Sequence, residues 1–282
     1  MRLKLTIANH DFSVLMALYD GEQESYLQCA FSSLFEQTLK PTEVILVIDG
    51  PIRSSLEDTI SYWKEKLHIK IIRLAENKGL SIALNVGLSS CTNDLVARMD
   101  TDDICKPTRF ESQVSFMNRN VDVDICGTFC TVISESGVEY DKLLVPCDDD
   151  TIKKLIWTCP IVHPSVIFRK ESIINIGSYS KKVPRRQDDY ELWIRAAMEN
   201  LTFANIPIYL LEYRLAIEKK TKNSLDVAFN RFAIGLPAVI RFDLRVLSLL
   251  GLMYPIVRAC LPVKLNIYLQ KLVRKIDPRK KH

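Results

Sequence analysis

Asp94-Leu-Val-Ala-Arg-Met-Asp-Thr-Asp-Asp103 begins as an apolar run and ends with three carboxylates in four residues. The run up to Met99 has the length and composition of a buried strand. Carboxylates this close repel one another unless protons or a cation relieve them. Mg²⁺ and Mn²⁺ prefer carboxylate and phosphate oxygens. The pattern predicts a strand that ends at a metal tethered to a diphosphate. The alternative is a solvated acidic turn before a helix that opens at Pro107.

Upstream, three more apolar runs alternate with segments of helical spacing. The runs are Phe12–Tyr19, Glu43–Asp49 and Ile69–Leu74, and the helical segments are 23–37, 54–66 and 80–88. This alternation predicts an α/β fold with a mainly parallel sheet and helices on both faces. Ligands of such sheets bind outside the carboxyl ends of the strands. Tyr19, Asp49, Asn77 and residues 100–103 are therefore the expected ligand-binding edge.

Downstream, the pattern is less regular. It predicts strands at 121–134, 138–144, 166–168 and 203–214, and helices at 107–119, 171–176 and 188–199. From about residue 223 it predicts helices broken at Pro237, Pro255 and Pro262.

Several classes of site lack their motifs. No G-x-G-x-x-G follows the first run and no G-x-x-x-x-G-K-[ST] occurs, so dehydrogenase and P-loop folds are disfavoured. Four scattered histidines without H-E-x-x-H give no support to a zinc or triad mechanism. The eight cysteines contain no C-x-x-C pair. We expect them to be small buried apolar groups in a reducing cytoplasm.

The formal charge of +4 conceals an uneven distribution. Residues 241–282 hold ten Lys or Arg against two acids, a charge of +8, which leaves −4 for the first 240 residues. The longest uncharged stretch of this tail, Val246–Val257, is 12 residues. A membrane span needs roughly 20 apolar residues, so we expect none. The start of the chain shows no signal-peptide pattern.

A second acidic cluster, Asp188-Asp189-Tyr190-Glu191, stands at the start of the helix expected at 188–199. Carboxylates here could simply cap the helix, because its dipole and free amides stabilise them. Beside a bound acceptor, one of them could instead act as a general base toward a hydroxyl group. The basic segment 181–186 before it is either a solvated loop or a phosphate neighbour.

Taken in order, seven stretches resemble glycosyltransferase family 2, of the bacterial exopolysaccharide and O-antigen type. They are Ser13–Tyr19, Leu34–Thr38, Glu43–Gly50, Asn77–Gly79, Arg98–Asp103, His163–Ser165 and Asp188–Trp193. The resemblance extends over about residues 12–215. It implies a GT-A fold, a nucleotide-sugar donor with UDP as the expected nucleotide, Mn²⁺ or Mg²⁺, and transfer with inversion at the anomeric carbon.

Roles follow by position in those motifs. Asp100 and Asp102 would hold the metal, and Asp189 would deprotonate the acceptor hydroxyl. The family often has two acids after the second strand, the first reading uracil, whereas here Ile48 takes that place and only Asp49 remains. The expected nucleotide-sugar-binding residues are Ala17, Tyr19, Asp49, Asn77, Arg98, Asp100 and Thr101, with His163 and Asp188 on the acceptor side.

The resemblance implies two regions, a GT-A domain over 1–220 and a C-terminal helical segment over 221–282. The segment's basic and apolar residues would associate with the cytoplasmic face of the membrane. There the enzyme would meet a lipid-linked saccharide acceptor, and no nucleic acid is expected as a partner. A helical subdomain packed on the body is the alternative for the tail.

Two other functions stay open at this point. A phosphatase of the haloacid dehalogenase type also has D-x-D after a strand, but near its N-terminus and with a small hydroxyl residue where Ile104 stands here. A non-catalytic scaffold of a polysaccharide-assembly complex could keep the fold, although none of the three key acids is missing.

Overall fold

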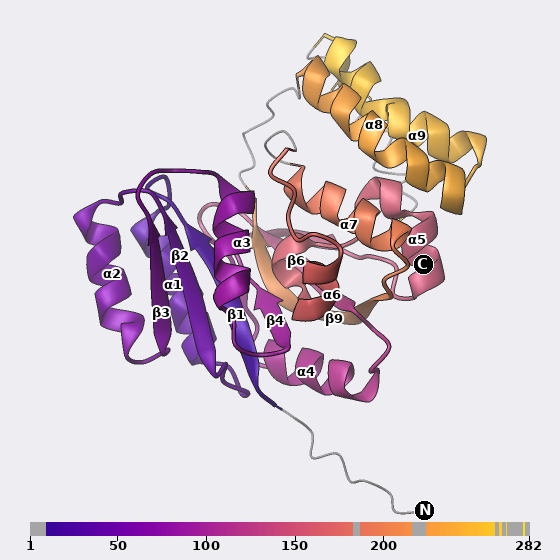
Figure 1. The fold of residues 1–282 in the computed structure, drawn as a ribbon. Coiled ribbons are helices and arrows are strands. Elements are labelled where there is room, and N and C mark those ends of the chain that lie inside the picture. The colour runs from indigo at the N-terminus through magenta and orange to yellow at the C-terminus, as the bar shows by residue number, and fades with distance from the viewer. Residues whose placement is uncertain are drawn as a thin grey trace, which may run out of the picture.

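The computed structural model describes residues 10–182, 187–215 and 224–262, together with residues 265, 266, 269 and 279. These form a mixed α/β structure around one sheet, ordered β3-β2-β1-β4-β8-β6-β9-β5, with β7 beside β6 (Figure 1). The strands are β1 (Phe12–Leu18), β2 (Glu43–Asp49), β3 (Ile69–Leu74), β4 (Leu95–Arg98), β5 (Ile104–Cys105), β6 (Ile125–Ile133), β7 (Glu139–Leu143), β8 (Ile167–Arg169) and β9 (Phe203–Arg214).

Helices flank and extend this sheet. They are α1 (Glu24–Phe35), α2 (Ser54–Lys64), α3 (Leu80–Ser90), α4 (Arg109–Arg119), α5 (Asp149–Lys154), α6 (Lys170–Asn175), α7 (Asp188–Met198), α8 (Leu225–Phe242) and α9 (Val246–Cys260). Two 3₁₀ helices, η1 (Ile156–Thr158) and η2 (His163–Ser165), lie between α5 and β8.

The first four strands confirm the predicted parallel sheet. β1 pairs in parallel with β2 on one side and with β4 on the other, and β2 pairs in parallel with β3. Leu15 stands at the centre of this register, opposite Ile45 and Arg98. The carboxyl ends of the four strands therefore meet at one edge, the arrangement that gathers residues distant in sequence.

Two apolar layers hold the helices to the two faces of the sheet. Because side chains alternate along a strand, Val14 and Met16 pack in the layer that contains α1, α2 and α4, whereas Leu15 packs in the layer of α3 and α7. All three side chains are fully buried. The helices on both faces match the prediction. Because they pack on both sides of the sheet, they hold the ends of the strands in place.

The second half of the sheet mixes directions. β8 is antiparallel to both β4 and β6, and β6 is parallel to β9. Two reversals restore the direction, so β9 runs parallel to β4 and ends at the same edge. The short elements β5, α5, η1 and η2 were not predicted, whereas β8 and α6, which are equally short, were.

The C-terminal helices α8 and α9 form a hairpin that packs on α7 and η1, above the sheet in Figure 1. The predicted breaks at Pro237 and Pro255 are wrong, since both prolines lie inside helices. Pro237 is exposed, and the packing of the two helices outweighs the one backbone hydrogen bond that each proline removes. Within the described ranges, we find no helix with both the length and the apolar composition to cross a bilayer.

The cysteine prediction is partly confirmed. All eight cysteines are free thiols, and four are buried: Cys91, Cys105, Cys126 and Cys130. Cys29 and Cys260 are exposed instead, because each lies on the outer face of its helix.

Candidate active site

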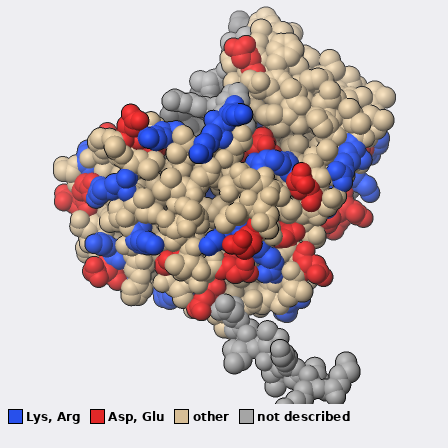
Figure 2. All heavy atoms as spheres, viewed as in Figure 1, with Lys and Arg blue, Asp and Glu red and all other residues tan. Residues whose placement is uncertain are grey.

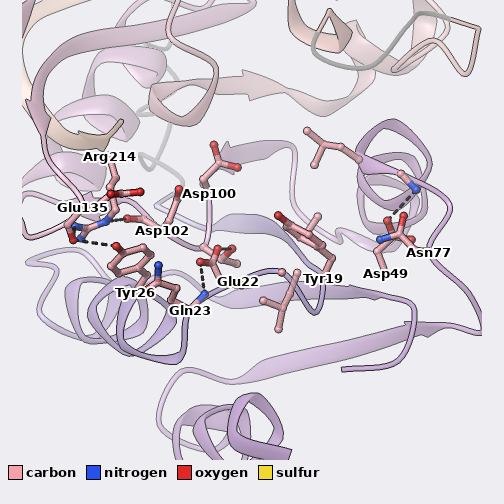
Figure 3. Close-up of a pocket in the computed structure, with 16 residues that line it drawn as sticks. Tyr19, Glu22, Gln23, Tyr26, Asp49, Asn77, Asp100, Asp102, Glu135 and Arg214 are labelled. Carbon is pink, nitrogen blue, oxygen red and sulfur yellow. Dashed lines mark hydrogen bonds between the residues drawn. The ribbon is translucent and has the colours of Figure 1, made fainter. Parts of the chain in front are cut away.

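A pocket of about 580 Å³ opens at the carboxyl edge of β1, β2 and β4. In Figure 3, Tyr19 lies between an acidic cluster on one side and Asp49 with Asn77 on the other. The structure brings together seven residues predicted from the sequence, which line this pocket: Ala17, Tyr19, Asp49, Asn77, Asp100, Thr101 and Asp102. Six of the seven were expected at strand ends within residues 12–103, and Ala17 was expected from the family resemblance.

Asp100, Asp102 and Asp103 each place one carboxylate oxygen within 4.8 Å of the others. Burial, followed by the charges of Asp100 and Glu22, raises the pKa of Asp102 to about 7. Burial and the charges of Asp100 and Asp102 also raise the pKa of Asp103, whose Oδ2 has no hydrogen-bond partner among the described residues. Crowded oxygen ligands with unrelieved negative charge fit a hard divalent cation.

Asp103 and the loop around it are held by Arg214, at the end of β9. The Arg214 amide donates to Asp103 Oδ1 at 2.8 Å, and its Nε donates to the Asp102 carbonyl at 2.8 Å. Its guanidinium lies 4.2 Å above the Tyr26 ring, whose hydroxyl donates to the Glu135 carbonyl at 3.0 Å. Arg214 thus brings a positive charge to the acidic side of the pocket (Figure 3).

Arg214, Tyr26, Glu22 and Glu135 were missed from the sequence, although all four line the pocket. Of these four, Arg214 is the residue that the sequence could have indicated, because it stands at the end of a predicted strand. To use this indication, the direction of β9 in the sheet must be known, and that direction depends on the two antiparallel pairings of β8.

Arg98 lies behind the pocket instead of lining it, which corrects its predicted placement. The side chain is 2% exposed, and its Nη2 forms an ion pair with Asp100 Oδ1 at 2.5 Å. Because a buried guanidinium needs a charged partner, the pair fixes the Asp100 carboxylate at the end of β4. Arg98 therefore acts on the pocket through Asp100.

Asp49 shapes the opposite wall. Its carboxylate is buried and accepts from the backbone amides of Lys78 at 2.7 Å and Gly79 at 2.9 Å. Gly79 has φ +92°, a conformation that a residue with a side chain rarely adopts. Asp49 thereby holds the turn that leads from β3 into α3, with Asn77 at the pocket surface.

Asp188 and Asp189 begin α7, outside the residues that line the pocket. The Ser81 hydroxyl of α3 donates to Asp188 Oδ1, two residues beyond Gly79 in the pocket wall. Burial raises the pKa of Tyr213, and the carboxylates of Asp103, Asp100 and Asp189 around it raise it further. The start of α7 thus lies against α3, next to the Gly79 wall of the pocket, and the Asp189 charge acts on Tyr213 together with the charges of Asp100 and Asp103.

Asp189 itself makes few contacts. Its Oδ1 accepts from the Tyr190 amide at 2.8 Å, and the Cys159 thiol lies 3.9 Å from its Oδ2. Burial raises its pKa, while the amide of Tyr190 and the charges of Arg231 and Arg98 act to lower it. A buried carboxylate with a raised pKa and a free lone pair is suited to accept a proton.

His163 does not present its ring to an acceptor, contrary to the prediction. It is 7% exposed, its Nε2 lies 2.8 Å from the Tyr179 hydroxyl, and its ring packs 5.8 Å from that of Trp193. Burial and the Arg98 charge lower the pKa of the imidazole well below its ordinary value. His163 is a neutral, internal hydrogen-bonding group.

Comparison with known proteins gives matches to a family profile and to individual proteins. Residues 13–177 match the profile described as "Glycosyl transferase family 2". The chain is 38% identical over 211 residues to the amylovoran biosynthesis glycosyltransferase AmsE of Erwinia amylovora, covering 75% of this chain and 79% of that protein. It is 35% identical over 208 residues to the UDP-Gal:alpha-D-GlcNAc-diphosphoundecaprenol beta-1,3-galactosyltransferase of Escherichia coli, covering 73% and 75%.

Among solved structures, S. aureus TarS 1–349 in complex with UDP is similar with a TM-score of 0.66 and 16% sequence identity. The match covers 88% of this chain and 71% of that chain. This likeness confirms the predicted fold.

Proposed function

This chain belongs to glycosyl transferase family 2, and we propose that it transfers a sugar with inversion from a UDP-sugar to a hydroxyl of a lipid-linked saccharide. The observation that carries the proposal is the pocket in which Asp100 and Asp102 face Tyr19 and Asn77 at the strand edge, with the start of α7 held against its wall by the Ser81–Asp188 hydrogen bond. A relative whose name specifies a UDP-sugar and a diphosphoundecaprenol acceptor supports the substrates, as does a similar fold crystallised with UDP-GlcNAc. The relative AmsE supports a place in polysaccharide biosynthesis.

The donor would lie along the strand edge. Tyr19, 53% exposed, offers a ring face for the nucleobase, and Ala17 borders it at the end of β1. Asp49 keeps the Asn77 turn in place, and the Thr101 hydroxyl donates to Glu22 in the wall below. Asp100 would face the ribose and a metal, and Asp102 would face the diphosphate.

Asp100 and Asp102 would hold Mg²⁺ or Mn²⁺, which supplies charge stabilisation for the leaving diphosphate. Asp189 would take the proton from the acceptor hydroxyl, and the resulting oxygen attacks the anomeric carbon from the side opposite the diphosphate. The new glycosidic bond forms as the bond to the diphosphate oxygen breaks. A single displacement of this kind inverts the configuration. Asp188, held by Ser81, would lie on the acceptor side.

The α8–α9 hairpin would bring the enzyme to the acceptor. Its outward residues Val246, Leu250, Met253 and Val257 recur at helical spacing along α9 and are exposed, and Figure 2 shows few charged side chains over this region. Exposed apolar stripes of this kind bind membrane interfaces. We therefore place the GT-A domain at 1–220 and a membrane-associating segment at 221–282, peripheral at the cytoplasmic face. Six of the ten basic tail residues lie outside the described residues: Lys264, Lys271, Arg274, Lys275, Lys280 and Lys281.

The experiment is a donor screen followed by transfer. The purified chain is incubated with a panel of nucleotide sugars and Mn²⁺, and nucleoside diphosphate release is measured with and without lipid-linked saccharide. We expect release from a UDP-sugar that increases with acceptor, and a product of inverted anomeric configuration. Release from no donor under either condition would favour the non-catalytic scaffold.

A further inference from the structure

The α8 helix packs directly on the end of α7 that carries the proposed base. The Gln187 side chain, one residue before α7, donates from Nε2 to the Val227 carbonyl of α8 at 2.6 Å. Gly235 lies so close to Tyr190 that a Cβ on it would be 2.1 Å from the Tyr190 hydroxyl oxygen. No larger residue fits there, so the approach of α8 to the start of α7 is close and specific.

Arg231 lies in the same contact. Its guanidinium carbon is 3.9 Å from the centre of the Tyr190 ring, a cation–π distance, and the side chain is half-buried. Tyr190 directly follows Asp189, and Asp189 forms no salt bridge in the described part of the chain. Arg231 is thus a positive charge that α8 adds beside a carboxylate without a paired cation.

The charged and titratable groups near Asp189 come from several parts of the chain, including Tyr213 of β9 and Tyr179 after α6, whose pKa values the Asp189 charge raises. Arg231 of α8 and Arg98 of β4 act to lower its pKa, and Asp188 of α7 acts to raise it. The Cys159 thiol, just after η1, faces it too and is itself near Arg231 and Arg279. Of the two cations that lower the pKa of Asp189, Arg98 is already paired with Asp100. Arg231 is the one whose distance from Asp189 depends on how the α8–α9 hairpin packs on α7.

We propose that Arg231 is a positioning residue for transfer: stacked on Tyr190, it fixes the start of α7 and keeps Asp189 in its ionised, proton-accepting form. The packing of the α8–α9 hairpin on α7 then determines what fraction of Asp189 is ionised and able to accept the proton. The proposal rests on the proposed role of Asp189 as that base. It links the surface that would bind the membrane to the residue that would activate the acceptor.

The test compares Arg231→Gln and Arg231→Lys with a matched control, Arg241→Gln, in the full chain. Arg241 is on the same helix but holds the other end of α7, donating to the Met198 carbonyl at 2.8 Å and to Asn200 Oδ1 at 2.6 Å. The kcat, the KM for the nucleotide sugar and the pH profile of transfer are measured with a soluble saccharide acceptor and saturating Mn²⁺.

We expect Arg231→Gln to move the acidic limb of the profile up by about 0.5–1 pH unit, and so to lower kcat about 3- to 10-fold on that limb. The sign follows because losing the nearby cation favours the protonated, inactive acid. The KM for the donor stays unchanged, Arg231→Lys restores the wild-type limb, and Arg241→Gln keeps it.

A wild-type limb in Arg231→Gln, or the same shift in Arg241→Gln, would overturn the proposal. If Arg231→Gln does not fold, Arg231→Lys provides the test, because it keeps the positive charge. An acidic limb displaced by about 0.5 pH unit or more in Arg231→Lys, the shift expected for loss of the charge, contradicts the proposal. Failure of the base assignment is separate, because it would appear as full transfer by Asp189→Asn.

Discussion

The two halves of this molecule organise their functional residues in different ways. In the β1–β4 half, the predicted pocket residues lie at or shortly after the ends of parallel strands, so local sequence places them. Around α7–α9, the important groups meet through packing between elements: Ser81 with Asp188, Cys159 with Asp189, and Arg231 with Tyr190. Under our proposal, the donor side belongs to the sheet edge, whereas the acceptor side depends on how the α8–α9 hairpin packs on α7. We propose that the first half binds the donor and the second activates the acceptor.

The largest effect is expected from the donor half. Asp102→Asn removes one carboxylate from the acidic cluster and should lower Mn²⁺-dependent transfer by about 10³-fold. The cause is the loss of charge stabilisation on the leaving diphosphate. Glu111→Gln, a carboxylate of α4 whose Oε2 accepts from the Thr38 hydroxyl away from the pocket, serves as a matched control. Transfer by Asp102→Asn at the wild-type rate would remove the cluster from the mechanism.

The pH dependence of transfer tests the proposed role of Asp189 in the second half of the molecule. Burial raises the pKa of Asp189 above 3.8, and protonation removes the lone pair that accepts the hydroxyl proton. Activity should therefore be present above the raised pKa and fall as the pH decreases through it. We expect a slope of about tenfold per pH unit on the acidic limb of kcat. A flat kcat profile down to pH 4 in the folded protein would contradict this.

A smaller effect is expected from the turn that supports the donor. Asp49→Asn keeps one acceptor oxygen but removes the charge that two backbone amides share. We expect the KM for the nucleotide sugar to increase about 5- to 20-fold, because charge-assisted hydrogen bonds to backbone amides contribute about 1.5–3 kcal/mol. The kcat should change little. A change in kcat alone would assign Asp49 to the chemistry instead of to the turn.

The hairpin surface is expected to affect transfer to a soluble acceptor least, and membrane binding instead. Leu247 and Leu250 are 64% and 59% exposed on α9. The double change to Glu should lower binding to vesicles containing anionic lipid by about 10-fold or more, since each leucine contributes roughly 1.5–3 kcal/mol when it is buried. Val121→Glu with Val138→Glu, both exposed on the sheet domain, is the control. Equal loss in both proteins would show that added charge, and not the hairpin, is responsible.

The same division explains how far the sequence could predict the structure. Ala17, Tyr19, Asp49 and the acids after β4 could be placed because strand alternation and strand ends are local signals. Arg214 could not, since its position depends on the direction of β9. His163 is a similar case. Its motif can be recognised in the sequence, but its burial against Tyr179 and Trp193 results from tertiary packing and could not be predicted.

The helical region makes the point again. Pro237 and Pro255 are local helix breakers, yet both lie within helices because the packing between α8, α9 and η1 is favourable enough to accept them. The close approach of Gly235 to Tyr190, on which the seating of Arg231 depends, has no counterpart in the sequence pattern. Residues 183–186, the last four of the predicted basic segment 181–186, lie outside the described residues.

The central claim is that donor binding and acceptor activation belong to separate halves, and Asp189→Asn tests it most directly. Binding of UDP with Mn²⁺ is measured by calorimetry on this variant and on wild type, and sugar transfer is measured on the same preparations. The account predicts unchanged UDP affinity with transfer reduced by about 10²–10⁴-fold, the usual contribution of a general base. Near-wild-type transfer, or a loss of UDP binding equal to the loss of transfer, would contradict it.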